Sequence, residues 1–65
     1  MHYFNSTAVR AALYNAATRT LTLWFTSGGQ AYDFYNVPDH VFQGLLAAGS
    51  KGQYYNAYIR DVYAA

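Results

Sequence analysis

The sequence predicts an α+β fold, with a three-stranded antiparallel β-meander followed by two short α-helices packed on one face of the sheet. Apolar residues tend to alternate with other residues between positions 8 and 36, which is typical of strands with one buried face. The period becomes helical after Pro38. No linker, internal repeat or low-complexity segment interrupts the chain, so residues 1–65 are expected to form a single domain.

The composition provides more aromatic surface than so small an interior can bury. The 65 residues include eight Tyr, four Phe and one Trp, and no cysteine that could form a disulfide or a thiolate metal site. Some rings should therefore lie in an oligomer interface or a binding site, and we expect a homo-oligomer. The net charge of +1 is too small for electrostatic capture of long nucleic acid. Without a membrane-length apolar run or a signal peptide, the chain is expected to be soluble and cytoplasmic, with no membrane contact.

The first strand is expected in the segment AVRAALY, residues 8–14. Alternation assigns one set of side chains to the core, Val9, Ala11 and Leu13, and the other set to the opposite face, Arg10, Ala12 and Tyr14. To keep these sets aligned with the second strand, the turn within residues 15–19 must leave an odd-numbered loop. An even loop would point Arg10 inward.

A hairpin is expected between the second and third strands, because Gly28-Gly29 is a pair that a type I′ turn favours. In the second strand, TLTLWFTS, the apolar residues at positions 21, 23 and 25 share one face. With the two glycines as the loop, the expected core-face pairs are Phe25–Tyr32 and Leu23–Phe34, and the opposite-face pairs are Trp24–Asp33 and Thr22–Tyr35.

Two helices are expected after the sheet. Pro38 suits the first helical position and Gly49 the C-terminal cap of the first helix. Its apolar stripe would consist of Val41, Phe42, Leu45, Leu46 and Ala48. Ser50 and Gln53 form the S-x-x-Q pattern that starts a second helix. On that helix one face carries Tyr55, Ile59 and Val62, and a neighbouring face carries Tyr54, Tyr58 and Asp61.

The second half of the chain resembles a known family, the KTSC domain. The resemblance is carried by SGGQAYDFYNVPDHVF from Ser27 and most specifically by SKGQYYNAYIR, residues 50–60, with a looser match through the first two strands. Members of this family are short modules found at the C-terminus of some lysyl-tRNA synthetases and alone in small bacterial and phage proteins. The synthetase association suggests RNA binding for the family. This chain departs from the family at its end, where small or aromatic residues replace basic ones (Ala57, Tyr58 and residues 62–65), which favours a drier contact with a protein, a second copy or a small flat ligand.

A candidate phosphate site lies at Ser50, Lys51 and Gly52, because a helix start combines free backbone amides with a hydroxyl and an ammonium group. The competing interpretation is structural. Ser50 would cap the helix, the glycines would permit a tight turn, and Lys51 would be solvated.

A second candidate surface is the uncovered face of the sheet, where Trp24, Tyr35, Tyr14 and Arg10 could stack on bases or on an adenine ring. Self-association through this aromatic face is the alternative. On the second helix, Tyr54 and Tyr58 have no core to face and are expected to contact a ligand or partner. Arg60 is too far along the helix to share one phosphate with Lys51, and it is expected to contact a ligand or partner or to pair with a carboxylate.

The sequence gives little support to catalysis. There is no Glu, no Cys and no His-x-x-x-His spacing, and neither His2 nor His40 has an assignable nucleophile beside it. We expect no enzyme activity, no cofactor and no metal site. The favoured function is non-catalytic binding of RNA or of a small nucleotide, which the protein could sequester. The alternative is a protein-interaction or inhibitor module, which would act on a host protein if the chain is phage-encoded.

Overall fold

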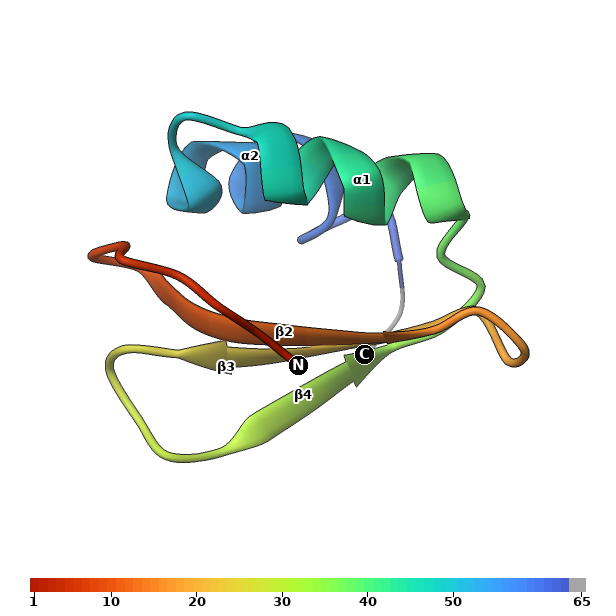
Figure 1. Cartoon of the computed structure of the whole chain (residues 1–65), viewed down its shortest axis with the longest axis horizontal. Coiled ribbons are helices and arrows are strands. Elements are labelled where there is room, and N and C mark those ends of the chain that lie inside the picture. Colours follow the sequence, from red (N-terminus) through yellow and green to blue (C-terminus); the bar gives the residue numbers. More distant parts are fainter. Residues whose placement is uncertain (64–65) are drawn as a thin grey trace.

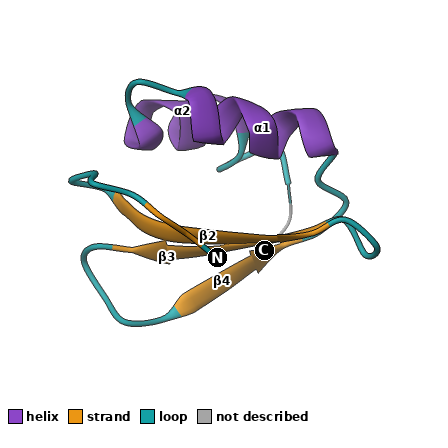
Figure 2. Cartoon of the chain, in the orientation of Figure 1, coloured by secondary structure: helices purple, strands orange, loops and turns teal. Residues whose placement is uncertain are grey.

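A computed structural model describes residues 1–63, and residues 64 and 65 of the expected domain lie outside that range. It contains one antiparallel sheet of four strands in the order β1-β2-β3-β4, with both helices on one side of it (Figure 1, Figure 2). The elements are β1 (His2–Tyr3), β2 (Val9–Asn15), β3 (Thr20–Phe25), β4 (Ala31–Phe34), α1 (Asp39–Ala47) and α2 (Lys51–Tyr58). The α+β architecture, with two helices on one face of an antiparallel sheet, is as the sequence predicts, but the sheet has four strands rather than three.

The additional strand is β1, a two-residue segment at the free edge of β2. His2 pairs with Ala12 and Tyr3 with Ala11, and the Phe4 N–H donates to the Arg10 carbonyl at 2.8 Å. A strand this short carries no detectable alternation, so sequence periodicity could not reveal it. Pairing of β1 places His2 on the helix side of the sheet, where its ring meets Phe42 edge-on at 5.4 Å.

The predicted facing of the first strand is wrong for most of its length. Asn15 pairs with Thr20, so the loop comprises residues 16–19 and is even-numbered, with Arg19 at a φ of 57°. Ala12 and Tyr14 therefore face the helices, whereas Ala11 and Leu13 lie on the outer face. Arg10 nevertheless stays exposed, because a β-bulge between Val9 and Ala11 shifts the register and returns Val9 to the core.

The register between β3 and β4 differs from the predicted one by two residues. Leu21 pairs with Phe34 and Leu23 with Tyr32, and the two glycines lie within a longer loop, residues 26–30. A shift of two residues preserves the face on which each side chain lies, so the core face of β3 is as predicted although the pairs are not. On the outer face, Thr22 pairs with Asp33, and the Thr22 hydroxyl donates to the Asp33 carboxylate at 2.6 Å.

The core lies between the sheet and the helices. Its buried side chains are Val9, Ala12, Leu21, Leu23, Phe34, Val37, Val41, Phe42, Leu45 and Ile59. Ser50 caps α2 as predicted, since its Oγ accepts from the Gln53 N–H at 3.3 Å. Pro38 is the N-cap of α1 rather than its first helical residue, and the C-cap is Ala48 rather than Gly49. Val62, which was expected to share the buried face of Ile59, is 62% exposed.

Candidate functional site

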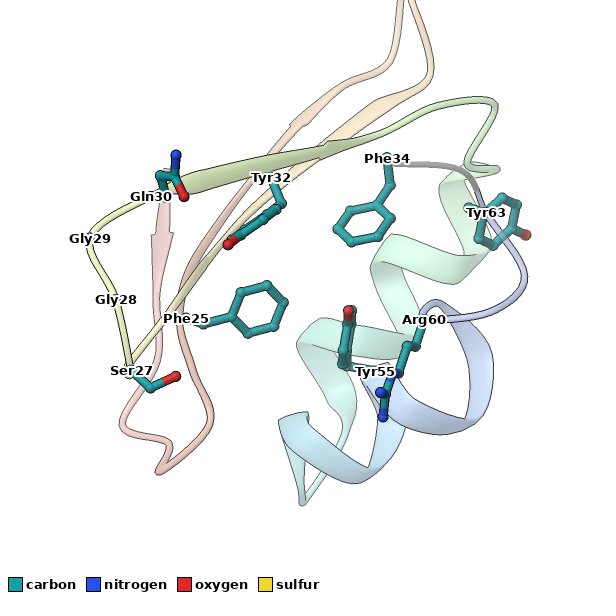
Figure 3. A pocket seen from close by; sticks show the side chains of 10 residues that line it. All are labelled: Phe25, Ser27, Gly28, Gly29, Gln30, Tyr32, Phe34, Tyr55, Arg60 and Tyr63. Carbon is teal, nitrogen blue, oxygen red and sulfur yellow. The ribbon is translucent and has the colours of Figure 1, made fainter.

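A groove of about 840 Å³ lies between β4 and the end of α2 (Figure 3). It is lined by Phe25, Ser27, Gly28, Gly29, Gln30, Tyr32, Phe34, Tyr55, Arg60 and Tyr63. These residues define the aromatic groove. It opens beside β4, which is an edge strand of the sheet.

The rings of the aromatic groove come from three elements. Phe25 of β3 meets Tyr32 of β4 edge-on at 5.6 Å between ring centroids. Tyr55 of α2 meets Phe25 edge-on at 4.9 Å and Phe34 at 5.9 Å. Tyr32 remains 45% exposed, and Phe25 and Tyr55 are partly exposed, so parts of these rings are accessible from the groove. The groove can therefore accept a flat ring without rebuilding the core.

Arg60 is the only cation among the residues that line this groove, and no carboxylate lines it. Its backbone is tied to the last turn of α2, because the Arg60 N–H donates to the Tyr55 carbonyl at 2.9 Å. Within residues 1–63 its guanidinium has no hydrogen-bond or ion-pair partner. Figure 3 shows this side chain alongside Tyr55. An anionic group at this end of the groove would find a free, planar donor.

Burial is the main cause that raises the pKa of the Tyr55 hydroxyl above its ordinary value. Arg60 acts in the opposite direction, while Asp61 and Tyr32 raise the pKa further. At neutral pH the Tyr55 phenol keeps its proton and can donate a hydrogen bond to a ligand.

At the start of α2, the predicted phosphate site has its polar groups engaged within the fold. The Lys51 ammonium donates to the carbonyls of Leu46 at 2.9 Å and Ala48 at 2.7 Å, at the C-terminal end of α1. The same Nζ lies 5.0 Å from the centroid of the Phe4 ring. A Cβ on Gly52 would come within 2.8 Å of the Ala8 Cβ, so this glycine permits a close approach. A hollow of about 420 Å³ lies beside Ser50, Lys51 and Gly52, but its one lysine is not free, and phosphate binding here remains a prediction.

Tyr54 packs on the core, contrary to the expectation that it has none to face. Its hydroxyl donates to the Val41 carbonyl at 2.9 Å, and its ring crosses α1 at Gly44, where a Cβ would lie 2.7 Å from the Tyr54 Cζ. Burial raises the pKa of the Tyr54 hydroxyl. Tyr58 is 57% exposed, and its ring centroid lies 4.7 Å from that of Tyr54. Of this predicted pair, Tyr58 alone is mainly exposed.

The predicted group on the outer face is only partly assembled. Tyr14 lies on the helix side, where its ring stacks on Phe42 at 5.0 Å and its hydroxyl donates to the Val37 carbonyl. The even-numbered loop after β2 causes this difference. Trp24 and Arg10 do lie together on the outer face, while Tyr35 follows the end of β4 and is 50% exposed. Sequence reasoning missed Tyr3, which β1 brings beside Trp24 and Arg10.

Sequence reasoning also missed the aromatic groove as a site. Tyr32, Phe25 and Phe34 were assigned to the core face, and no sequence signal showed that α2 leaves part of that face open. The Gly28-Gly29 pair was the one indication in the sequence, because loops often carry binding residues.

Residues 1–63 contain neither a cluster of metal-binding side chains nor a membrane-spanning helix. No group of three or more His, Cys, Asp and Glu side chains in this range could hold a metal ion. Neither described helix has the length and apolar character that a membrane span requires.

Comparison with known proteins assigns the chain to a family. A protein from Tsukamurella paurometabola is 42% identical over 65 residues, which is 100% of this chain and 96% of that protein. A lysine–tRNA ligase from Nostoc sp. is 42% identical over 52 residues, 80% of this chain but only 9% of the enzyme. The crystal structure of a KTSC domain protein from Yersinia pestis superposes with a TM-score of 0.92 at 24% identity, over 97% of this chain and 87% of the other, and this likeness concerns the fold. The family model of the KTSC domain matches residues 5–63, and this chain therefore belongs to the KTSC domain family.

Proposed function

We propose that this chain is a non-catalytic binding module whose aromatic groove holds one nucleotide unit. The base would lie against the rings of the groove, and the phosphate would meet the Arg60 guanidinium. The observation that carries the proposal is a lining of five aromatic side chains and no carboxylate, together with one arginine that has no side-chain partner among residues 1–63.

Stacking and charge would contribute comparably to such binding. Stacking of a base on an aromatic side chain is worth about 1–3 kcal/mol by alanine substitution. An arginine presents two parallel donors to a phosphate, which adds geometric specificity. The volume of about 840 Å³ suits a ligand of nucleotide size. A single cation favours a free nucleotide or one residue of a short RNA, because long nucleic acid is held through many phosphates.

The relatives add indirect support. Lysine–tRNA ligases of Nostoc sp. and Nostoc punctiforme contain a region similar to this chain that makes up 9% and 8% of their length. Enzymes named for a tRNA substrate would be served by an appended module that binds nucleotide units. A stand-alone copy with the same groove could instead sequester a free nucleotide.

Isothermal titration calorimetry with adenosine and uridine 5′-monophosphates tests this proposal. We expect saturable binding that weakens about tenfold, or about 1.4 kcal/mol, in Arg60→Gln and at least as much in Tyr32→Ala. Arg19→Gln and Tyr58→Ala are matched controls outside the groove and should leave the affinity unchanged. Adenosine, which lacks the phosphate, should bind wild type and Arg60→Gln equally.

The proposal fails if neither nucleotide binds at millimolar concentration. It also fails if Arg60→Gln and Arg19→Gln weaken binding to the same extent, because the effect would then reflect net charge alone.

A partner protein is the second candidate, and the unpaired edge of β4 is the observation that favours it. A strand added beside β4 would cover the mouth of the aromatic groove with its inward-facing side chains. The accessible test is a second copy of this chain. Amide hydrogen exchange of residues 31–34 should slow as protein concentration rises if copies pair here, and should stay constant if they do not.

A further inference from the structure

A separate hollow of about 420 Å³ lies on the outer face of the sheet, opposite the helices. It is lined by Met1, Tyr3, Arg10, Ala11 and Trp24, which define the outer-face site. The aromatic groove lies on the helix side of the sheet, so no residue is shared between the two.

One cross-strand row forms the base of this site. Tyr3 of β1 pairs with Ala11 of β2, and Ala11 pairs with Trp24 of β3, so all three side chains lie on the same face. The two aromatic residues are thus two strand spacings apart, about 9.5 Å at the backbone. Ala11 lies between them and is 2% exposed, so neighbouring side chains already cover the centre of the row. The accessible aromatic surface of the site belongs to Tyr3, which is 76% exposed, and to the partly exposed Trp24.

The β-bulge in β2 places the positively charged side chain of Arg10 at this site. Ala12 and Tyr14 face the helices, and strict alternation would therefore turn Arg10 to the helix side as well. The register shift between Val9 and Ala11 instead leaves Arg10 exposed beside Tyr3 and Trp24. Bulges often re-aim a side chain in this way near functional sites.

No acidic side chain within residues 1–63 pairs with the Arg10 guanidinium. Asp33 is the acidic residue in the strands of this face, and its carboxylate accepts the hydrogen bond from Thr22. Within residues 1–63 the Arg10 side chain has no ion-pair or hydrogen-bond partner, and the cation–π contact in this range is that of Lys51 with Phe4. A cation that has no partner among the described residues and lies beside two aromatic side chains complements an anion that carries a flat ring.

We propose that the outer-face site binds one nucleotide unit, with its base stacked on Trp24 and Tyr3 and its phosphate at Arg10. Tyr3 is 76% exposed and Trp24 is partly exposed, so a base can stack on their accessible surfaces without entering the covered space over Ala11. This site is independent of the aromatic groove. A protein with both would hold two nucleotide units on opposite sides of its sheet.

Trp24 is the single tryptophan of the sequence, so tryptophan fluorescence reports on this site alone. Titration with adenosine 5′-monophosphate should quench Trp24 emission in a saturable way, because the base stacks on the indole. Arg10→Gln should weaken the apparent affinity about tenfold, whereas the matched control Arg19→Gln should not. Tyr3→Ala should weaken it similarly, and this exposed position, with 76% of its surface accessible, tolerates truncation without loss of the fold.

Three results would overturn the inference. No quenching up to about 10 mM nucleotide, beyond the range of weak binding, excludes a site of this kind. Equal quenching in wild type and Arg10→Gln excludes the assigned phosphate contact. A blue shift of Trp24 emission that grows with protein concentration and prevents quenching identifies a second copy as the occupant. Arg60→Gln should leave the quenching unchanged, so failure of the aromatic groove and failure of the outer-face site are distinguishable.

Discussion

The two ends of α2 differ in how their polar groups are used. At its start, Ser50 caps the helix, and the Lys51 ammonium donates to two carbonyls at the C-terminal end of α1. Gly52 allows the close approach of Ala8. At its end, Tyr55 borders an open groove and Arg60 has no partner within residues 1–63. The most specific part of the family motif, residues 50–60, spans both ends, and the polar groups at its start are engaged inside the fold. One motif can therefore combine residues that close a fold with residues whose side chains stay accessible.

The largest expected effect comes from filling the space between α1 and α2. Gly44→Ala should lower the free energy of unfolding by about 2 kcal/mol, because the new Cβ displaces the Tyr54 ring and its hydrogen bond to Val41. In a helix without this contact, the same substitution would raise the free energy of unfolding by about 1 kcal/mol. The sign of the measured change therefore distinguishes the two cases. Urea denaturation followed by circular dichroism measures the difference.

Gly49→Ala is the matched control for this substitution. No atom lies within 4 Å of a Cβ at Gly49, so the free energy of unfolding should change little. The double variant Gly44→Ala/Tyr54→Leu should lose less stability than the sum of the two single variants. Additive losses would show that Gly44 and Tyr54 do not interact as described.

An intermediate effect is expected at the start of α2. Lys51→Met should lower the free energy of unfolding by about 1.5 kcal/mol, because two carbonyls of α1 lose a charged donor. Nucleotide affinity measured by calorimetry should not change. Weaker binding with unchanged stability would instead support a phosphate site at Ser50–Gly52, and Arg19→Met controls for the loss of one positive charge.

The smallest effect concerns pH. Burial raises the pKa values of Tyr54 and Tyr55 in the folded protein, so the folded state binds more protons than the unfolded state above pH about 10. The contribution of these two hydroxyls to the free energy of unfolding is fully present below their pKa in the unfolded state. It is lost as pH rises through their pKa in the folded state. Unfolding curves between pH 9 and pH 12 should therefore show a falling midpoint that is less steep in Tyr54→Phe than in wild type. An equal slope in the two proteins would contradict the burial described for Tyr54.

Sequence reasoning predicted the fold better than the site. Alternation placed β2 and β3, and helical spacing placed α1, because these elements bury several spaced side chains. The Gly28-Gly29 pair and the S-x-x-Q pattern were the signals for β4 and α2. The facing of β2 was wrong because alternation cannot distinguish an even loop followed by a bulge from an odd loop without one. The Ser50 cap was predictable because its hydrogen bond is local in sequence.

Tertiary contacts explain why the candidate site differs. Lys51 finds its acceptors only after α1 and α2 pack together, and Tyr54 finds Val41 in the same way. The aromatic groove depends on how far α2 covers β4, which no local pattern encodes. Tyr3 joins the outer face through a strand of two residues. The sequence alone therefore does not reveal whether a side chain is engaged when its partner lies on another element of the fold.

The central claim is that ligands bind at the end of α2 rather than at its start. We would measure amide ¹H–¹⁵N chemical shifts during titration with adenosine 5′-monophosphate, using Arg10→Gln protein to weaken the outer-face site. The account predicts shifts at Gly28, Tyr32 and Arg60 that saturate together, with Ser50–Gly52 unaffected. Shifts confined to Ser50–Gly52, with the aromatic groove unchanged, would contradict it.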